Sequence, residues 1–211
     1  RLGLPKDTPT LSLASPFDYP GRTLLYIPGP QFPEPAEPNC PQAQHECMAT
    51  LITHAGGRTL ALFTSLAAMD QAHRALRARL PYPLLLQGEA PRRVLLHQFS
   101  RETDSVLFAV SSFWEGVDVP GEALSLVIID KLPFEVPSDP VIMARMNRIK
   151  ALGGNPFNEY QVPRAILTLR QGVGRLMRTA EDQGVIAILD TRLYTKGYGR
   201  QFLRSLPPSP V

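Results

Sequence analysis

The chain has 211 residues, enough for one sizeable domain with a continuous core and too few for two large ones. A hydrophobic content of 44% and a charged content of 19% are typical of globular proteins and exclude a disordered chain. The net charge is only +3, although arginine outnumbers lysine 18 to 4, an excess that suits phosphate binding and that a coding bias explains equally well.

Targeting and metal-binding signals are absent from the sequence. No apolar run approaches the length of a membrane span, and the first residues do not resemble a signal peptide. Cys40 and Cys47 lie seven positions apart with His45 between them, a spacing unlike that of zinc or iron–sulfur ligands. We therefore expect no metal site in this chain. Two lone thiols favour a reducing, cytoplasmic setting.

Apolar segments alternate with amphipathic ones along the chain. A Pro-rich loop over residues 27–41 precedes a predicted helix at 42–54, which Gly56 and Gly57 should end. Further helices are expected at 65–80, 91–99, 140–152 and 163–178, and apolar strands at 59–63, 83–87, 105–110, 124–129 and 185–189. Continuous apolar strands separated by helices indicate a parallel sheet that is buried on both faces. The sequence therefore predicts a doubly wound α/β domain.

Two stretches that could bind a ligand each follow a predicted strand. At 63–65, hydroxyl and backbone N–H groups suit a phosphate oxygen, although Ser65 could simply cap its helix. Residues 111–121 contain two serines, the only tryptophan, two carboxylates and two glycines, an unusual set for a connecting loop. The alternative for this second stretch is a structural loop that is anchored by its aromatic side chains.

The third stretch is Q-G-V-G-R-L-M-R at 171–178. On a continuous helix, Gln171, Arg175 and Arg178 would share one face, and two guanidiniums with an amide suit a polyphosphate. A surface helix with basic residues is the alternative. Because open α/β sheets bind ligands at the carboxyl ends of their strands, we expect all three stretches there.

Together, the three stretches resemble motifs IV, V and VI in the second RecA-like domain of superfamily 2 helicases. More closely, they resemble the DinG/XPD branch of iron–sulfur DNA helicases, and within it the bacterial YoaA-type proteins. The resemblance covers essentially the whole chain. It implies a RecA-like domain over residues 1–206 with a short Pro-rich tail at 207–211. Its matching segments are A-S-P-F-D-Y at 14–19, S-F-W-E-G-V-D at 112–118, I-I-D-K-L-P-F at 128–134, the octapeptide, and L-D-T-R at 189–192.

The resemblance implies an ATP-dependent helicase that moves 5′ to 3′ on DNA and acts in repair or replication rescue. In the family, motif VI contacts ATP that is bound by the first motor domain, so Arg175 and Arg178 would stabilise the γ-phosphoryl group and Gln171 would help to sense it. Four more residues are expected around the nucleotide. One is Gly174, and the other three, which would also couple the nucleotide to the DNA path, are Glu115, Gly116 and Asp118 of motif V.

The resemblance also implies a path for single-stranded DNA. Contacts to DNA phosphates are expected from Ser65, Ser111 and Ser112. Trp114 would either stack on a base or anchor its loop, and we favour the anchor. The expected partners are single-stranded or forked DNA, the first motor domain and, as in YoaA-type proteins, the χ subunit of the replicative clamp loader. The alternative function is therefore a protein-docking module. The expected location is the bacterial cytoplasm, in association with the nucleoid.

Several family features are missing from the chain. None of its four lysines is followed by Ser or Thr as in a phosphate-binding loop, and no Asp-Glu dipeptide could form a Walker B box. The four cysteines that hold the family's 4Fe-4S cluster are also absent. In the family these features belong to the first motor domain. We therefore expect that domain, with the iron–sulfur and arch regions, to lie outside this chain, and the intact protein to bind ATP and Mg²⁺.

Overall fold

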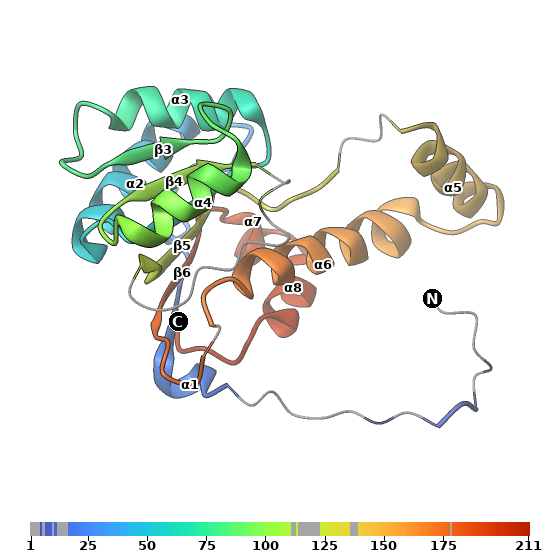
Figure 1. The fold of residues 1–211 in the computed structure, drawn as a ribbon. Coiled ribbons are helices and arrows are strands. Elements are labelled where there is room, and N and C mark those ends of the chain that lie inside the picture. Colours follow the sequence, from blue (N-terminus) through green and yellow to red (C-terminus); the bar gives the residue numbers. More distant parts are fainter. Residues whose placement is uncertain are drawn as a thin grey trace.

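The fold is built on one parallel six-stranded sheet (Figure 1). We analysed a computed structural model, which describes residues 5, 7–9, 11, 17–110, 113, 123–135, 139–177 and 179–211. The strand order is β1-β6-β5-β2-β4-β3, and every pairing is parallel. The strands are β1 (Thr23–Tyr26), β2 (Thr59–Leu62), β3 (Leu84–Leu86), β4 (Val106–Ala109), β5 (Leu126–Ile129) and β6 (Gly184–Ile188).

Helices cover both faces of this sheet, which confirms the predicted doubly wound α/β class. On one face, Met48 and Ile52 of α2 and Leu76 of α3 pack in a single core. On the other face, Phe99 of α4, Leu169 of α6 and Phe202 of α8 belong to a second core. The helices are α1 (Tyr19–Arg22), α2 (Cys40–Ala55), α3 (Leu66–Leu76), α4 (Arg92–Arg101), α5 (Pro140–Ala151), the π-helical η3 (Phe157–Gln161), α6 (Val162–Val173), α7 (Arg192–Thr195) and α8 (Gly199–Ser205).

Local chemistry explains where the main elements begin and end. The central strands β2, β4 and β5 are buried along their whole length, as their continuous apolar sequences predict. Gly56 ends α2 with a left-handed φ of 66°, as expected. A Cβ at Gly57 would collide with the Asp104 carbonyl oxygen, so glycine is required there.

Two differences from the predicted elements matter for the site. The helix expected at 163–178 ends at Val173, because Gly174 caps it and the chain turns away. The edge strand β1 was not predicted. It has only four residues, and Leu24 is 46% exposed, so its apolar signal is weak. The Pro-rich tail lies beside β1, where the Leu25 N–H donates to the Pro210 carbonyl at 2.7 Å.

One part of the fold stands apart from the sheet. Figure 1 shows α5 projecting away from the body, connected to it through η3 and the start of α6. We call residues 139–161, which contain α5 and η3, the α5 arm. Within the described ranges, no helix is both long and apolar enough to cross a membrane.

Candidate nucleotide and DNA sites

The predicted motif VI lies at the amino end of the sheet, where the strands begin, and not at the carboxyl end as expected. A crossover helix in a parallel sheet runs antiparallel to the strands, so the segment between α6 and β6 must precede the strands. The contacts agree, since the Val185 N–H donates to Ser125 just before β5 at 2.8 Å. The topology therefore overturns the expected location of this stretch.

The end of α6 also changes how the motif VI side chains are arranged. The Gly174 N–H donates to the backbone carbonyl of Arg170, and the Arg175 N–H donates to the backbone carbonyl of Gly172 at 3.1 Å. The chain therefore makes a tight turn here. The Arg175 guanidinium Nε donates to the carbonyl of Gln171 at 3.0 Å. Gln171 is exposed and Arg175 is half-buried. The prediction that Gln171 and Arg175 share the face of a continuous helix is wrong, and Arg178 lies outside the described residues.

The position of the motif VI turn is fixed by the two residues that follow Arg175. Leu176 and Met177 are each only 2% exposed, and Leu176 belongs to the core beneath α6. Burying two large apolar side chains contributes several kcal/mol, roughly 1.5–3 for each. The turn is therefore anchored to the core, and it holds Arg175 at a defined place on the amino end of the sheet.

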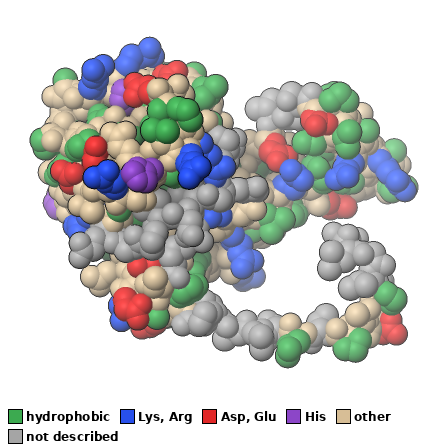
Figure 2. All heavy atoms as spheres, in the orientation of Figure 1, with side chains coloured by type: hydrophobic (Ala, Val, Ile, Leu, Met, Phe, Trp, Pro, Cys, Tyr) green, Lys and Arg blue, Asp and Glu red, His purple; other side chains and the backbone are tan. Residues whose placement is uncertain are grey.

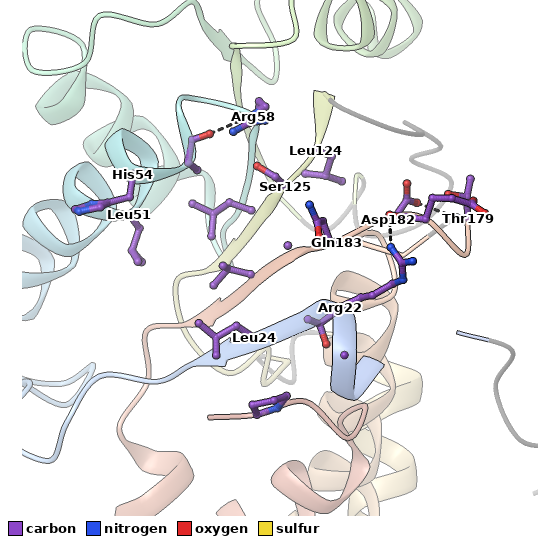
Figure 3. A pocket seen from close by; sticks show the side chains of 18 of the residues that line it. Arg22, Leu24, Leu51, His54, Arg58, Leu124, Ser125, Thr179, Asp182 and Gln183 are labelled. Carbon is purple, nitrogen blue, oxygen red and sulfur yellow. Dashed lines mark hydrogen bonds between the residues drawn. The ribbon is translucent and has the colours of Figure 1, made fainter. Parts of the chain in front are cut away.

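An open groove of about 1270 Å³ lies at the same end of the sheet (Figure 3). Arg22 from α1, Arg58 from the turn before β2 and Asp182 from the segment after motif VI line it. Arg22 donates to the Glu181 carbonyl at 2.9 Å, and Arg58 donates through Nε to the Ala55 carbonyl at 2.9 Å. Sequence reasoning missed both arginines, because neither stands in a motif. Glu181 and Asp182 line the same groove, so its two guanidiniums are matched by two carboxylates.

Ser65 lies at the opposite, carboxyl end of the sheet. Its Oγ accepts from the Ala68 N–H at 3.2 Å and caps α3, as one of the two predicted roles requires. Ser65 is also exposed, as are Leu66 and Ala67 at the start of α3. The second predicted role, binding a DNA phosphate, stays a prediction.

Motif V connects the two ends of the sheet. The chain leaves β4 at Val110, at the carboxyl end, and returns at Ala123 before β5, at the amino end. Phe113 is 2% exposed, its N–H donates to Val110 at 2.8 Å, and Arg92 lies 5.2 Å from its ring centroid. The predicted residues of this motif lie outside the described residues: Ser111, Ser112, Trp114, Glu115, Gly116 and Asp118.

Two buried carboxylates, which were not predicted as site residues, follow β5 and β6 at the carboxyl end of the sheet. Asp130 accepts from the N–H groups of Thr64 at 3.1 Å and Lys131 at 2.7 Å, and its other oxygen contacts the Thr64 hydroxyl at 3.3 Å. The Gln44 side chain donates to the Asp130 carbonyl at 2.5 Å and the Leu189 carbonyl at 3.2 Å. Asp130 thus joins the end of β5 to the residue before Ser65.

Asp190 holds the neighbouring strand end in a similar way. It is fully buried and accepts from the Leu132 N–H at 2.8 Å. The Arg192 guanidinium donates to it through Nη2 at 2.6 Å and through Nε at 2.9 Å. Arg192 in turn lies 5.6 Å from the ring centroid of Phe134. This pair fixes the segment that leads from β5 to the α5 arm.

The two free thiols have different surroundings. Cys40 is buried, and Cys47 donates to the Tyr26 hydroxyl at 3.6 Å. Burial raises the pKa of both thiols. Among the residues that the structure describes, no group of three or more His, Cys, Asp or Glu side chains is arranged to hold a metal ion.

Asp130 predicts a dependence of stability on pH. Burial raises the pKa of Asp130 to about 7, against the lowering effects of Lys131 and of the hydrogen bonds from Lys131 and Thr64. Between pH 4 and 7 the folded chain holds a proton that the unfolded chain has released, so stability should fall as pH rises through this window. The loss is up to about 4 kcal/mol and is complete above pH 7.

The Asp130→Asn substitution should remove this loss. An asparagine oxygen can still accept from the Thr64 and Lys131 N–H groups, and its amide can donate to the Thr64 hydroxyl. We expect the variant to match the unsubstituted chain near pH 4 and to be more stable above pH 7, as measured by denaturant unfolding across that range. An unchanged pH dependence in the variant would contradict this assignment.

A fully parallel sheet with helices on both faces places the chain among the doubly wound α/β domains, the class to which RecA-like domains belong. A family model described as the helicase C-terminal domain matches residues 48–209. Two solved XPD helicase structures resemble the fold with TM-scores of 0.66 and 18% identity. The match to the first of these structures covers 87% of this chain and 34% of the chain in that structure.

Curated relatives with higher sequence identity than the solved structures are also named helicases. The ATP-dependent DNA helicase YoaA of Escherichia coli K12 is 46% identical over 210 residues, which cover 100% of this chain and 33% of the relative. The ATP-dependent helicase DinG of Mycobacterium tuberculosis H37Rv is 43% identical and covers 98% of this chain and 31% of its own length. The chain therefore belongs to the helicase C-terminal domain family, in its DinG/YoaA-type branch, as its motifs predicted. It spans about a third of the length of these relatives.

Proposed function

We propose that this chain is the second RecA-like motor domain of an ATP-dependent DNA helicase that moves 5′ to 3′ and acts in DNA repair or replication rescue. Two relatives that match 100% and 99% of the chain are named ATP-dependent DNA helicases. The observation that carries the proposal is the motif VI turn. It holds Arg175 at the amino end of the sheet, in a chain whose sequence has no phosphate-binding loop of its own.

In this proposal the ATP site is composite. The first motor domain binds ATP and Mg²⁺, and Arg175 and Arg178 reach the γ-phosphoryl group from this chain, with Gln171 beside them. A planar guanidinium forms two parallel hydrogen bonds to phosphate oxygens and stays charged throughout turnover. Gly174 lies in the turn, and its backbone would approach the nucleotide together with motif V, whose expected contacts are Glu115, Gly116 and Asp118.

DNA binds in this proposal at the carboxyl end of the sheet. The exposed Ser65 and the N-terminus of α3 offer a hydroxyl and backbone N–H groups to a phosphate, while Ser111, Ser112 and Trp114 act from motif V. Motif V starts at the DNA end and finishes at the nucleotide end, so a change at one site can move the other. This connection is the physical route by which ATP turnover would drive movement along DNA.

The partners follow from the same proposal. They are single-stranded or forked DNA and the first motor domain, which would also carry the 4Fe-4S cluster. We propose a cytoplasmic, nucleoid-associated location. Docking of the clamp-loader χ subunit stays a prediction, and it is compatible with the motor role because one domain can carry both half an ATP site and a docking surface.

The proposal is tested by comparing this chain alone with the protein in which it is joined to a first motor domain. We expect no DNA-stimulated ATP hydrolysis from the 211-residue chain, once circular dichroism has shown that it is folded, because no group in it can replace the phosphate-binding lysine. The joined protein should hydrolyse ATP in the presence of single-stranded DNA. Robust turnover by the chain alone would contradict the composite site.

A further inference from the structure

We propose that the α5 arm is a second binding surface for the phosphodiester backbone of single-stranded DNA. This inference rests on the proposed motor function, and it adds a contact that none of the predicted motifs contains. Figure 2 shows basic side chains on the part of the molecule that projects from the body, together with a few acidic ones. The basic residues of α5 are Arg145, Arg148 and Lys150.

The first observation is that α5 has no buried residue. Ile142, Met146 and Ile149 are half-buried, and the rest of the helix is exposed. Val141, Arg145, Arg148 and Leu152 follow one another at helical spacing and form one exposed stripe, in which Val141 is 60% and Leu152 is 78% exposed. A helix of 12 residues is marginally stable on its own in water. An exposed apolar and basic stripe on such a helix is therefore better explained by a binding role than by folding.

The second observation is the charge of α5. The helix has Arg145, Arg148 and Lys150 and no carboxylate. Asp139 precedes it, but its side chain is engaged as the N-cap, with Oδ1 accepting from the Val141 N–H at 2.7 Å. In the described part of the chain, none of the three cations forms an ion pair. Cations in the last turn also favour the helix dipole, which accounts for Arg148 and Lys150 but not for Arg145 in the middle.

The third observation is the place where the arm is attached. It leaves the carboxyl end of β5, the end of the sheet where Ser65 lies. Arg164 forms a two-pronged salt bridge with Glu135, at 2.7 and 2.9 Å. Phe134 stacks on Phe157 with ring centroids 5.4 Å apart. These contacts join the two ends of the arm at its base, at the end of the sheet where the proposed DNA path lies.

Single-stranded DNA fits this surface better than a purely anionic protein would. Arginine and lysine bind phosphates whatever the sequence, as movement along DNA requires. Val141 and Leu152 lie beside the cations, where they can contact sugars and unpaired bases that a duplex would hide. The arm would thus lengthen the phosphate track that begins at Ser65 and motif V.

The test compares two triple variants of the intact helicase. The arm variant is Arg145→Gln, Arg148→Gln and Lys150→Gln. The control variant is Arg74→Gln, Arg77→Gln and Arg101→Gln, which removes the same charge from exposed positions at the far ends of α3 and α4. Affinity for oligo-dT is measured by fluorescence anisotropy over a range of salt concentrations, and thermal unfolding checks that both variants are folded.

We expect the arm variant to bind oligo-dT roughly ten- to a hundredfold more weakly at 0.1 M salt. The slope of log K against log salt should shrink by about 0.7 for each phosphate that the arm no longer neutralises. The control should retain the affinity and slope of the unsubstituted protein. A charge-conserving variant, Arg145→Lys with Arg148→Lys, should keep most of the slope.

Two results would overturn the assignment of the arm to DNA. One is an arm variant with unchanged affinity and slope. The other is an arm variant that binds oligo-dT normally but no longer unwinds DNA, which would show that the arm contacts another protein surface. Both can occur while the unsubstituted helicase shows DNA-stimulated ATP turnover that depends on Arg175. The arm proposal can therefore fail while the motor proposal stands. Loss of Arg175-dependent ATP turnover would in turn contradict the motor proposal without any measurement on the arm.

Discussion

Replacing Arg175 by alanine in the intact helicase should lower the ATP turnover number by roughly a thousandfold or more. The substitution removes the guanidinium proposed to stabilise charge on the γ-phosphoryl group during transfer. Affinity for single-stranded DNA should remain near that of the unsubstituted protein, because the turn lies at the amino end of the sheet and the proposed DNA contacts lie at the carboxyl end. Steady-state ATPase assays and oligonucleotide binding measure the two effects separately.

The structure also predicts how related substitutions rank. Arg175→Lys should recover only part of the turnover, because an ammonium cannot bind two phosphate oxygens in parallel. Arg204→Ala, on the exposed surface of α8, is the matched control and should leave turnover unchanged. Leu176 and Met177 anchor the turn in every case, so the Arg175 variants should remain folded. Turnover of Arg175→Ala within threefold of the unsubstituted protein would rule out the assigned role.

The same turn shows what sequence reasoning could and could not predict. The central strands were predicted because each is a continuous apolar run that is buried along its length. The composition of motif VI was recognisable, but its position was not. Which end of a sheet a segment occupies depends on whether it follows a strand or a crossover helix. The rule that open α/β sheets bind ligands at the carboxyl ends of their strands placed motif VI at the wrong end of the sheet, because this segment follows the crossover helix α6.

The carboxylate network was missed for a different reason. Asp130 and Asp190 each follow an apolar strand directly, and that pattern was visible in the sequence. Their partners could not be read from it, because Thr64 lies 66 positions from Asp130 and Leu132 lies 58 positions from Asp190. Only the strand order, which places β5 between β2 and β6, brings these groups together. Motif patterns therefore identified the proposed ligand-binding side chains but not the buried groups that position them.

The Asp190→Ala substitution should lower the free energy of unfolding of the chain by about 3–5 kcal/mol, because it removes one partner of a buried ion pair. The partly buried Arg192 would lose its direct partner and keep only its weaker attraction to Glu34, and the Leu132 N–H would lose its acceptor. The matched control is Glu135→Ala, which breaks the exposed pair with Arg164 and should cost at most about 1 kcal/mol. Urea unfolding of the three proteins gives the comparison directly.

A double variant separates the cost of the stranded charge from the loss of packing around it. If the loss of Arg192's partner causes most of the destabilisation, then Asp190→Leu with Arg192→Leu should be more stable than Asp190→Ala, since no partly buried charge is left without its direct partner. The Leu132 N–H is unsatisfied in both variants, so it does not contribute to this difference. A double variant as unstable as Asp190→Ala would instead show that the hydrogen bond from Leu132 provides most of the stabilisation. The pair with Arg192 would then contribute little to holding the segment that leads from β5 to the α5 arm.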